Sequence, residues 1–375
     1  MTLTATYPMT PPEGIELDWG QMDRTWSWIR DLRGCPQDPI HHAEGDVWTH
    51  VRMVCEELLA LPVWATLPGS VRDILFAAAL LHDVAKPVCT TLEPEGRVSS
   101  RGHSRRGALM ARRLLWELGV PFEVREAICW LVRTHQVPFW LLEREDSRRT
   151  VLEMSQSGRC DWLAILAEAD MRGRCCPDQE LQIEKVHLFA EYCREEGCFD
   201  RPWPFPSATA RFEYVRKPDR DPSYAPWTDH GSTVVVMSGL PGSGKDHWIR
   251  HNRPDWPVVS LDDIRTEMGH APTGKQAAVV HRAREMAREH LRAKRNFVWN
   301  ATNIQRSMRD QVIGLMADYN AYIQLVYIEV PHETLWAQNR NREAAVPDAA
   351  MHRMIDRWEP PSVTEAHDVW FVTEP

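Results

Sequence analysis

Three predicted helices in the first half of the chain each aim one ionisable side chain at the core. They span residues 47–61, 123–135 and 161–172, and the side chains are His50, His135 and Asp170. Each lies on the same helical stripe as its apolar neighbours, such as Val51 and Val54 beside His50. These side chains are the usual protein ligands of metal ions.

Further ligand-type side chains occur at the ends of other predicted elements. The segment 74–83 is apolar up to its last two residues, His82 and Asp83, and we expect Lys86-Pro87 to stop this helix. His103 follows a glycine where a loop turns into the next predicted helix. The six candidate metal ligands are therefore His50, His82, Asp83, His103, His135 and Asp170.

A shared metal site explains why so many such groups point inward. A single histidine of this kind is more simply a core residue hydrogen-bonded to a carbonyl, but burying several ionisable groups needs a common partner. Mixed imidazole and carboxylate ligands suit Mn, Fe, Co, Ni, Cu or Zn, and the set is large enough for two ions sharing a carboxylate. Such ions lower the pKa of a bound water and neutralise the oxygens of a phosphoester under in-line attack.

The second half contains a glycine-rich loop between a predicted buried strand, 234–237, and a predicted helix, 247–251. This order predicts a P-loop, in which backbone N–H groups and the helix N-terminus face a phosphate chain and Lys245 bridges its β- and γ-phosphates. We expect it to bind ATP, or another nucleoside triphosphate, with Mg²⁺. Asp246 stands where Ser or Thr normally binds the metal. The candidate nucleotide-binding residues are Gly239, Gly242, Ser243, Gly244, Lys245 and Asp246.

Phosphoryl transfer also needs a base for the acceptor and positive charge for the transition state. The predicted strand 258–261 delivers Asp262 to its carboxyl end, with Arg265 one helical step away. Near the end of the chain, Arg340 and Arg342 precede a Val-Pro pair and could form an arginine-bearing lid. Paired acids also cap helices and surface arginines are common, so it is their occurrence after a P-loop that favours a kinase.

The pattern of elements predicts a multidomain chain of the α and α/β classes. Helical patterns dominate residues 1–200, residues 201–230 form a Pro-rich linker, and β-branched strands alternate with helices in residues 231–375. We expect an all-helical domain followed by a parallel sheet flanked by helices.

Composition narrows the function classes. The 375 residues carry a net charge of −9, nine cysteines without a CxxC pair, and no apolar run long enough to cross a bilayer. A chain that coats nucleic acid, a disulfide framework and a membrane protein are therefore not expected, and residues 1–20 lack a signal peptide. We expect a cytoplasmic protein with reduced thiols. The segment 280–310 has eight Lys and Arg residues against three acids, which permits a polyanionic ligand.

The residues of the first half resemble the HD phosphohydrolase superfamily, whose pattern H…HD…H…H…D they meet in order. The words GDVWTH and LLHDVAKP resemble the HD domain of bacterial tRNA nucleotidyltransferases, although the chain has no Gly-Gly pair like that of their nucleotidyltransferase site. The resemblance implies a helical domain that acts on phosphodiesters, including 2′,3′-cyclic ends. It also implies that His50, His82, Asp83 and Asp170 hold one metal, while His103 and His135 reach a second ion or the phosphate. Lys86, in the second word, is a further candidate catalytic residue.

The second half is similar to 5′-OH polynucleotide kinases of the P-loop type. By this resemblance Asp262, in the word DDIR, takes the proton from the 5′-OH and Arg265 grips a nearby phosphate. The lid arginine on the donor phosphates corresponds to Arg340 or Arg342. The word NATN at residues 300–303 resembles the DATN of that family, with Asn300 in place of the acid.

The combination of both halves resembles the bifunctional bacterial end-healing enzymes called HD-Pnk, whose P-loops share the Gly-Lys-Asp ending. The resemblance implies RNA repair: a kinase for 5′-OH ends and a phosphohydrolase that removes 2′,3′-cyclic or 2′-phosphates. The partners would be RNA, or DNA, ends and a separate RNA ligase, because the chain has no KxDG motif. Two alternatives remain. One is a small-molecule phosphotransferase fused to an HD nucleotide phosphohydrolase, and the other is a regulatory ATP-binding HD sensor.

Overall fold

The computed structural model describes residues 17–94, 96–271, 274, 276–342 and 344–373. The chain forms two compact units, Met1–Trp203 and Pro204–Pro375. Residues 1–16, which make up most of the segment expected to lack a signal peptide, lie outside the described residues. None of the helices that the structure describes combines the length and the apolar character needed to span a membrane.

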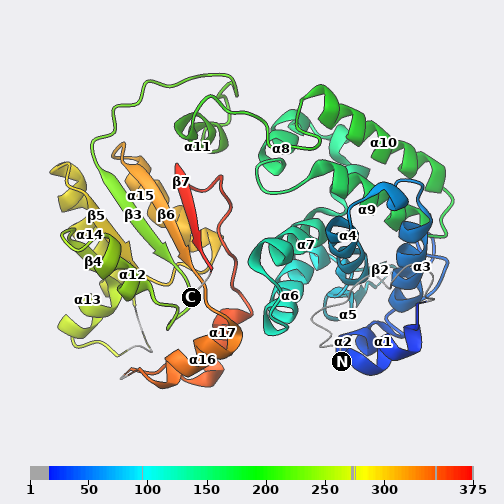
Figure 1. The fold of residues 1–375 in the computed structure, drawn as a ribbon, viewed down its shortest axis with the longest axis horizontal. Helices are drawn as coiled ribbons and strands as arrows, with labels where there is room; N and C mark the ends of the chain where they lie inside the picture. The colour runs from blue at the N-terminus through cyan, green and yellow to red at the C-terminus, as the bar shows by residue number, and fades with distance from the viewer. Residues whose placement is uncertain (1–16, 95, 272–273, 275, 343, 374–375) are drawn as a thin grey trace. The chain divides into compact units, whose positions relative to one another are not determined.

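The first unit is helical, as predicted (Figure 1). Helix α3 packs against α4 and α9, α4 against α7, and α6 against α7. Besides the helices there is one short antiparallel hairpin, β1 (Thr91–Leu92) with β2 (Val98–Ser99). The α-helices are α1 (Trp19–Thr25), α2 (Ser27–Leu32), α3 (Val47–Ala60), α4 (Gly69–Leu81), α5 (Lys86–Cys89), α6 (His103–Glu117), α7 (Phe122–Thr134), α8 (Ser147–Met154), α9 (Cys160–Arg172) and α10 (Gln179–Glu195).

The sequence explains where helix α3 begins and which of its faces is buried. The Asp46 side chain accepts a hydrogen bond from the Thr49 N–H at 2.8 Å and so caps the first turn. Val51 and Val54 are fully buried, and His50 is buried beside them. The inward orientation of His50 is therefore confirmed.

The prediction for the end of α4 was wrong in detail. The helix ends at Leu81, so His82 is its C-cap and Asp83 lies in the following turn. Pro87 does not stop α4 but occupies the first turn of α5, where its missing N–H leaves no hydrogen bond unmade. The turn lets His82 and Asp83 point into the same space.

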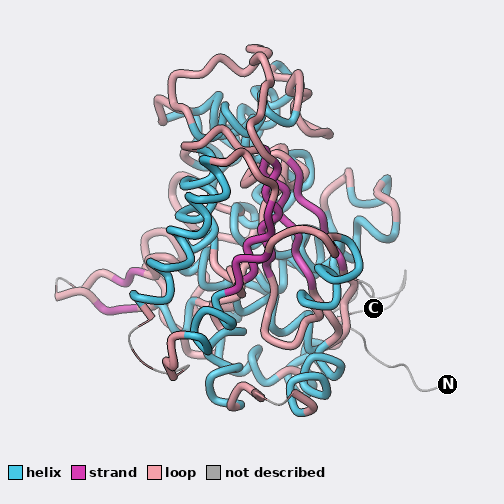
Figure 2. The backbone as a smooth tube through the Cα atoms, turned by 90° about the vertical axis from the view of Figure 1, so that its left-hand side faces the viewer, coloured by secondary structure: helices cyan, strands magenta, loops and turns pink. Residues whose placement is uncertain are grey.

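The second unit contains a five-stranded parallel sheet in the order β4-β5-β3-β6-β7, which confirms the predicted α/β class. In Figure 2 its strands run side by side in magenta. The strands are β3 (Thr233–Ser238), β4 (Val258–Ser260), β5 (Phe297–Asn300), β6 (Tyr322–Ile328) and β7 (Asp368–Val372). The helices are α11 (Ala208–Arg216), α12 (Lys245–Asn252), α13 (Leu261–Glu267), α14 (Ala277–Arg292), α15 (Arg306–Ala317), α16 (His332–Arg340) and α17 (Asp348–Ile355).

Strand β3 is buried on both faces, and its side chains alternate between two apolar cores. Val234 and Val236 pack with residues of α14 and α15, whereas Val235 and Met237 pack with Ile249 of α12. Because β5 and β6 flank it, β3 is the central strand, and the chain order switches at its carboxyl end. The P-loop follows at that end.

Part of the segment expected to be a linker is structured. Residues 208–216 form α11, which Ser207 caps by accepting a hydrogen bond from the Ala210 N–H at 3.0 Å. Phe212 of this helix is buried in the core formed by β3, α14 and α15. Prolines lie on both sides of α11, and the apolar stretch within it is short. Composition alone therefore does not reveal this helix.

Candidate active sites

The structure brings all six predicted metal ligands of the first unit together. His50 comes from α3, His82 and Asp83 from the end of α4, His103 from the start of α6, His135 from the end of α7 and Asp170 from α9. All six are buried. Residues from five helices that are far apart in the sequence therefore meet in one core.

Each of the four histidines is oriented by its backbone contact. The Nδ1 atoms lie near the carbonyl oxygens of Gly173, Ala79, Ser100 and Val132, at 3.2, 2.7, 2.8 and 2.9 Å for His50, His82, His103 and His135. An Nδ1–H that donates to a carbonyl fixes the tautomer and leaves Nε2 unprotonated, with a free lone pair. All four Nε2 atoms are thereby available as ligands.

The free Nε2 atoms converge on the two carboxylates. His50 Nε2 lies 3.1 Å from Asp170 Oδ1, and His82 Nε2 lies 3.2 Å from Asp83 Oδ2. The other oxygen of Asp83, Oδ1, lies 3.3 Å from His103 Nε2. His135 Nε2 is 3.4 Å from that of His103. Asp83 therefore stands between two groups of ligands, His50 with His82 and His103 with His135.

This donor set fits a divalent transition metal. Oδ1 of Asp83 is buried without a hydrogen-bond partner among the described residues, a costly state unless a cation approaches it. His50, His82 and Asp83 have ligand atoms within 4.8 Å of one another, and so do Asp83, His103 and His135. Imidazole nitrogens combined with carboxylates are donors that divalent transition metals prefer.

The protonation states of Asp83, Asp170 and His135 also suit a metal, whereas for His82 burial lowers the pKa but Asp83 and Asp170 outweigh it and raise the pKa. Burial raises the pKa of Asp83, but Lys86 and His82 outweigh it and hold this pKa well below its usual range. For Asp170, burial is likewise outweighed by Arg174, so the pKa is well below its usual range. Burial lowers the pKa of His135 to about 3. Anionic carboxylates and a neutral imidazole are the forms that bind metal ions.

Lys86 is placed by the same turn. Its Nζ lies 2.8 Å from Asp83 Oδ2 and donates a hydrogen bond to Gln37 Oε1 at 2.6 Å. The side chain is buried, so its charge acts in a medium of low dielectric constant. The structure therefore puts a cation at the edge of the ligand cluster.

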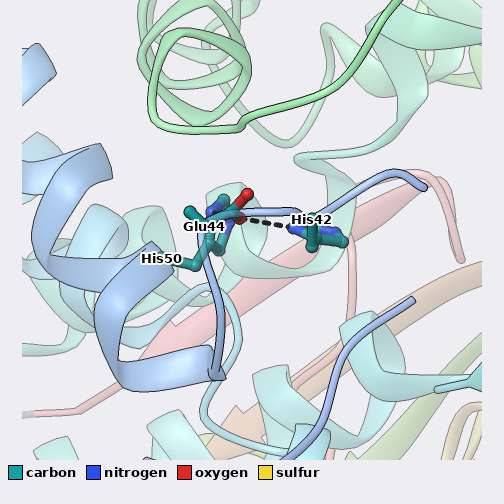
Figure 3. Close-up of side chains that lie close together, drawn as sticks. All are labelled: His42, Glu44 and His50. Atoms are coloured by element: carbon teal, nitrogen blue, oxygen red, sulfur yellow. Dashed lines mark hydrogen bonds and ion pairs between the residues drawn. The ribbon is translucent and has the colours of Figure 1, made fainter. Parts of the chain in front are cut away.

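Glu44 and His42 form an outer layer that sequence reasoning missed. Glu44 Oε1 lies 3.0 Å from His50 Nδ1 and 2.8 Å from His42 Nδ1, and its carboxylate lies between the two labelled histidines in Figure 3. The Cys175 N–H donates to the other oxygen, Oε2, at 2.8 Å. Burial raises the pKa of Glu44, but these hydrogen bonds outweigh it and lower the pKa. A carboxylate behind a ligating histidine orients the ring and makes it more basic.

The backbone beyond α9 approaches α3 closely enough to hold His50. A Cβ on Gly173 would lie 2.7 Å from the Val54 backbone nitrogen, so only glycine fits here. Arg174 donates from Nε to Asp170 Oδ1 at 3.0 Å and from Nη2 to Asp170 Oδ2 at 2.6 Å. The spacing of four residues from Asp170 was the one sequence signal for Arg174. Glu44 lies in a loop and gave no periodic signal.

In the second unit, the predicted P-loop joins β3 to α12. Gly239 has φ +152°, and a Cβ there would lie 2.4 Å from the Ile328 carbonyl oxygen and 2.7 Å from Ser243 Oγ. Gly244, with φ 98°, is the N-cap of α12, which begins at Lys245. Ser243 Oγ is buried without a hydrogen-bond partner among the described residues. The loop therefore has the tight turn and the helix N-terminus that bind phosphates.

The NATN segment after β5 anchors this loop. The Gly239 N–H donates to the Thr302 carbonyl at 2.8 Å, and Ser238 Oγ donates to the Asn303 carbonyl at 3.0 Å. Asn303 Nδ2 donates to the Met237 carbonyl at 2.7 Å. This segment is therefore a structural support of the P-loop, a role that the sequence did not reveal.

Lys245 lies close to three of the other predicted site residues. Its Nζ donates to the carbonyls of Gly239 and Leu240, at 3.0 and 2.8 Å. Burial lowers the pKa of Lys245 to about 8, with Asp246 and Asp262 raising it and Arg342 lowering it further. A charged side chain shifts the pKa of Lys245 in this way only when it lies near the ammonium group. Arg342 is half-buried, whereas Arg340 is exposed.

Asp262 and Arg265 form an ion pair at the carboxyl end of β4. Both lie on α13, which Ser260 caps by accepting a hydrogen bond from the Asp263 N–H at 3.2 Å. Arg265 Nε donates to Gln276 Oε1 at 2.8 Å. The Asp262 side chain is 75% exposed, so the carboxylate is open to a ligand.

Asn339, which the sequence did not single out, joins α16 to Val346 in the segment predicted to be a lid. The buried Asn339 donates through Nδ2 to the Val346 carbonyl at 2.8 Å and accepts from the Val346 N–H at 3.1 Å. A Cβ on Gly242 would lie 3.4 Å from the Asn339 backbone nitrogen. The base of the lid therefore touches the P-loop.

Two family models match the chain. Residues 46–160 match the HD domain, and residues 234–361 match the AAA domain. The first match contains the four histidines and Asp83, and the second contains the P-loop and Asp262.

The chain is also similar to parts of known proteins. The CC-adding tRNA nucleotidyltransferase of Thermus thermophilus is 39% identical over 105 residues, which cover 28% of this chain and 22% of that protein. The Multifunctional CCA protein of Azoarcus sp. is 27% identical over 212 residues, 45% of this chain and 47% of that protein. The chain thus spans less than half the length of these relatives. A sugar kinase from Janibacter sp. aligns with a TM-score of 0.30 and 15% identity, over 38% of this chain and 85% of that one.

The fold and the two sites together define the class of protein. The chain joins an HD phosphohydrolase domain to a P-loop kinase-like domain. An HD domain implies a divalent metal, and a P-loop kinase-like domain implies a nucleotide with Mg²⁺.

Proposed function

We propose that this protein heals broken RNA ends as a member of the HD-Pnk group. Its kinase domain phosphorylates a 5′-OH end with ATP, and its HD domain removes a 2′,3′-cyclic or 2′-phosphate from the other end. The products suit a separate RNA ligase. The similarity to a CC-adding tRNA nucleotidyltransferase supports RNA ends as the substrate.

The observation that carries the polynucleotide assignment is the pair of Asp262 and Arg265. An exposed carboxylate that can take a proton from a hydroxyl stands beside a cation that can hold a phosphate. A polynucleotide end offers both a hydroxyl and a phosphate, because the sugar that carries the terminal 5′-OH also carries a phosphate on its 3′ side. A free nucleoside or sugar acceptor offers only the hydroxyl.

In the kinase step, the 5′-oxygen forms a bond to the γ-phosphorus while the bond from that phosphorus to the β–γ bridging oxygen breaks. The hydroxyl proton passes to Asp262, and ADP leaves. Lys245 bridges the β- and γ-phosphates, and Arg265 holds the acceptor phosphate. Arg342, rather than Arg340, neutralises the donor phosphates, because it is the lid arginine near Lys245.

For the HD step, His50, His82, Asp83 and Asp170 would hold one ion, and His103 and His135 would reach a second ion or the phosphate. Bound metal ions supply Lewis acidity toward water and toward the phosphoryl oxygens. The backbone carbonyls hold the imidazoles in place, and Lys86 adds positive charge where the phosphate approaches.

Acceptor choice tests the kinase assignment. We would measure transfer from γ-labelled ATP to a 5′-OH RNA oligonucleotide, the matching DNA, a nucleoside 3′-monophosphate and the nucleoside. The proposal predicts that the oligonucleotide and the 3′-monophosphate are accepted far better than the nucleoside. It also predicts that Arg265→Ala removes most of this difference. Equal use of the nucleoside would instead support a small-molecule phosphotransferase.

The HD assignment is tested on RNA that ends in a 2′,3′-cyclic phosphate. We would remove metals by chelation and add Mn²⁺, Ni²⁺, Co²⁺ or Cu²⁺ separately. Loss of the cyclic phosphate that depends on added metal is the expected result. No hydrolysis with any metal, in protein that binds the metal, would support a sensor instead.

A further inference from the structure

The two residues that depart from the usual P-loop pattern contact each other. Asp246 replaces the Ser or Thr of the P-loop, and Asn300 stands where an acid is found in the similar kinases. In the structure, Asn300 Nδ2 donates a hydrogen bond to Asp246 Oδ1 at 2.7 Å. Asp246 is the second residue of α12, and Asn300 is the last residue of β5.

Their positions are those of the usual Mg²⁺-holding pair. P-loop enzymes in general hold the ion with a hydroxyl on the P-loop and with an aspartate outside it. Asn300 ends a strand that pairs directly with β3, with Trp299 beside Val236 and Asn300 beside Ser260 of β4. It therefore lies between the P-loop and the strand that leads to Asp262.

The charge of the pair is also the usual one. A hydroxyl and a carboxylate together carry one negative charge, as do Asp246 and Asn300. A second carboxylate in hydrogen-bonding range of the first would repel both it and the phosphates. The amide of Asn300 avoids this repulsion and holds one oxygen of Asp246. The other oxygen, Oδ2, accepts no hydrogen bond from the residues that the structure describes.

We propose that Asp246 and Asn300 form the Mg²⁺-holding unit of the kinase site with the two roles exchanged between loop and strand. The P-loop supplies the carboxylate, and the strand supplies the neutral partner that orients it. This inference rests on the proposed kinase function. Asp246 is then a metal-holding residue, and Asn300 is a positioning residue.

A mutant cycle tests the exchange through binding rather than turnover. We would measure the Kd of a non-hydrolysable ATP analogue by calorimetry, with and without Mg²⁺, for the wild type, Asp246→Ser, Asn300→Asp and the double variant. Asp246→Asn keeps the size of the side chain but removes its charge, and Asp255→Asn, at an exposed acid after α12, serves as a control for net charge. Thermal melting checks that each variant is folded.

The proposal predicts a different defect in each single variant. Asp246→Ser and Asp246→Asn should each reduce the affinity gain from Mg²⁺ by about tenfold. Asn300→Asp should weaken metal-free binding by about tenfold, because two carboxylates then face the phosphates; both sizes lie in the range of coupling between contacting residues. The double variant restores one carboxylate and one neutral partner, so its Mg²⁺ gain should return to within about threefold of wild type.

The outcomes separate this inference from the proposed function. If the double variant keeps the Asp246→Ser defect, so that the two changes simply add, the exchange is wrong although the kinase stands. The same holds if Asn300→Asp binds like the wild type. If the wild type binds no ATP analogue with or without Mg²⁺, the kinase function fails and the inference fails with it.

Discussion

The HD site and the kinase site differ in how completely the protein forms them by itself. In the HD site, all six proposed ligands are buried and each histidine is held by a backbone carbonyl. In the kinase site, the Asp262 side chain is 75% exposed, and the arginine near Lys245 lies in the lid segment after α16. The buried HD site is a closed cage, which suits small ions. The kinase site lies at an open edge of the sheet, which suits two large substrates whose binding completes the site.

This difference predicts how each site fails. A change inside the cage should remove the ion and with it the whole activity. A change at the open edge should remove one interaction with one substrate.

Asp83→Ala should abolish the phosphoesterase activity. Asp83 stands between both groups of histidines, and even an outer partner of a metal ligand is worth about 10- to 100-fold, so the loss should exceed about 100-fold. Hydrolysis of 2′,3′-cyclic ends and metal content by mass spectrometry measure it. The 5′ kinase activity of the same preparation should stay within about twofold. Loss of both activities in folded protein would show that the sites are not separate.

Asp262→Asn should reduce 5′ phosphorylation by about 10²- to 10⁴-fold, the usual contribution of a general base. The substitution keeps the size of the side chain, and the Kd for ATP should change little. Asp263→Asn, at the exposed neighbouring acid, is the matched control and should keep most of the activity. If Asp263→Asn were the inactive variant, the assignment of the base would have to move by one residue.

Glu44→Gln should lower metal affinity by about 10- to 100-fold without unfolding the domain, because Glu44 lies behind His50 rather than among the ligands. Titration of the chelated protein with Mn²⁺ or Co²⁺ measures this directly. Activity should recover at high metal concentration, which Asp83→Ala should not show. Glu123→Gln, at an exposed glutamate of α7, is the control. An unchanged metal affinity in Glu44→Gln would mean that the Gly173 carbonyl alone orients His50.

Arg342→Ala should raise the KM for ATP or lower kcat by about tenfold, and Arg340→Ala should have a several-fold smaller effect. Arg342 is near enough to Lys245 to lower its pKa, whereas Arg340 is exposed. A steady-state ATP titration at a fixed 5′-OH oligonucleotide concentration distinguishes the two. A larger effect of Arg340→Ala would show that the lid rearranges on binding.

The sequence predicted more of the buried site than of the open one. His50, His135 and Asp170 were found because a 3.6-residue period marks the inner face of a helix, and their helices are where we expected them. The end of α4 was misplaced because a proline in the first turn of one helix looks like a stop for the previous one. Glu44 and Gln37 lie in loops, where no period applies, so only the folded chain shows that they face His50 and Lys86.

In the second unit, local sequence patterns predicted the motifs but not the contacts between them. The P-loop and the Asp262 word are local patterns and could be read directly. The hydrogen bond between Asn300 and Asp246, and the support of the P-loop by Asn303, join residues of different strands and loops. Such contacts depend on which strands are neighbours, and no local sequence pattern indicates the order of the strands.

The proposed function is tested most directly on one RNA with a 5′-OH at one end and a 2′,3′-cyclic phosphate at the other. The RNA would be incubated with the wild-type protein, γ-labelled ATP, Mg²⁺ and Mn²⁺, and both ends would be resolved. The proposed function predicts a labelled 5′-phosphate and loss of the cyclic phosphate on the same molecules. An RNA left unchanged at both ends, by protein that phosphorylates nucleosides or hydrolyses small phosphoesters, would contradict it.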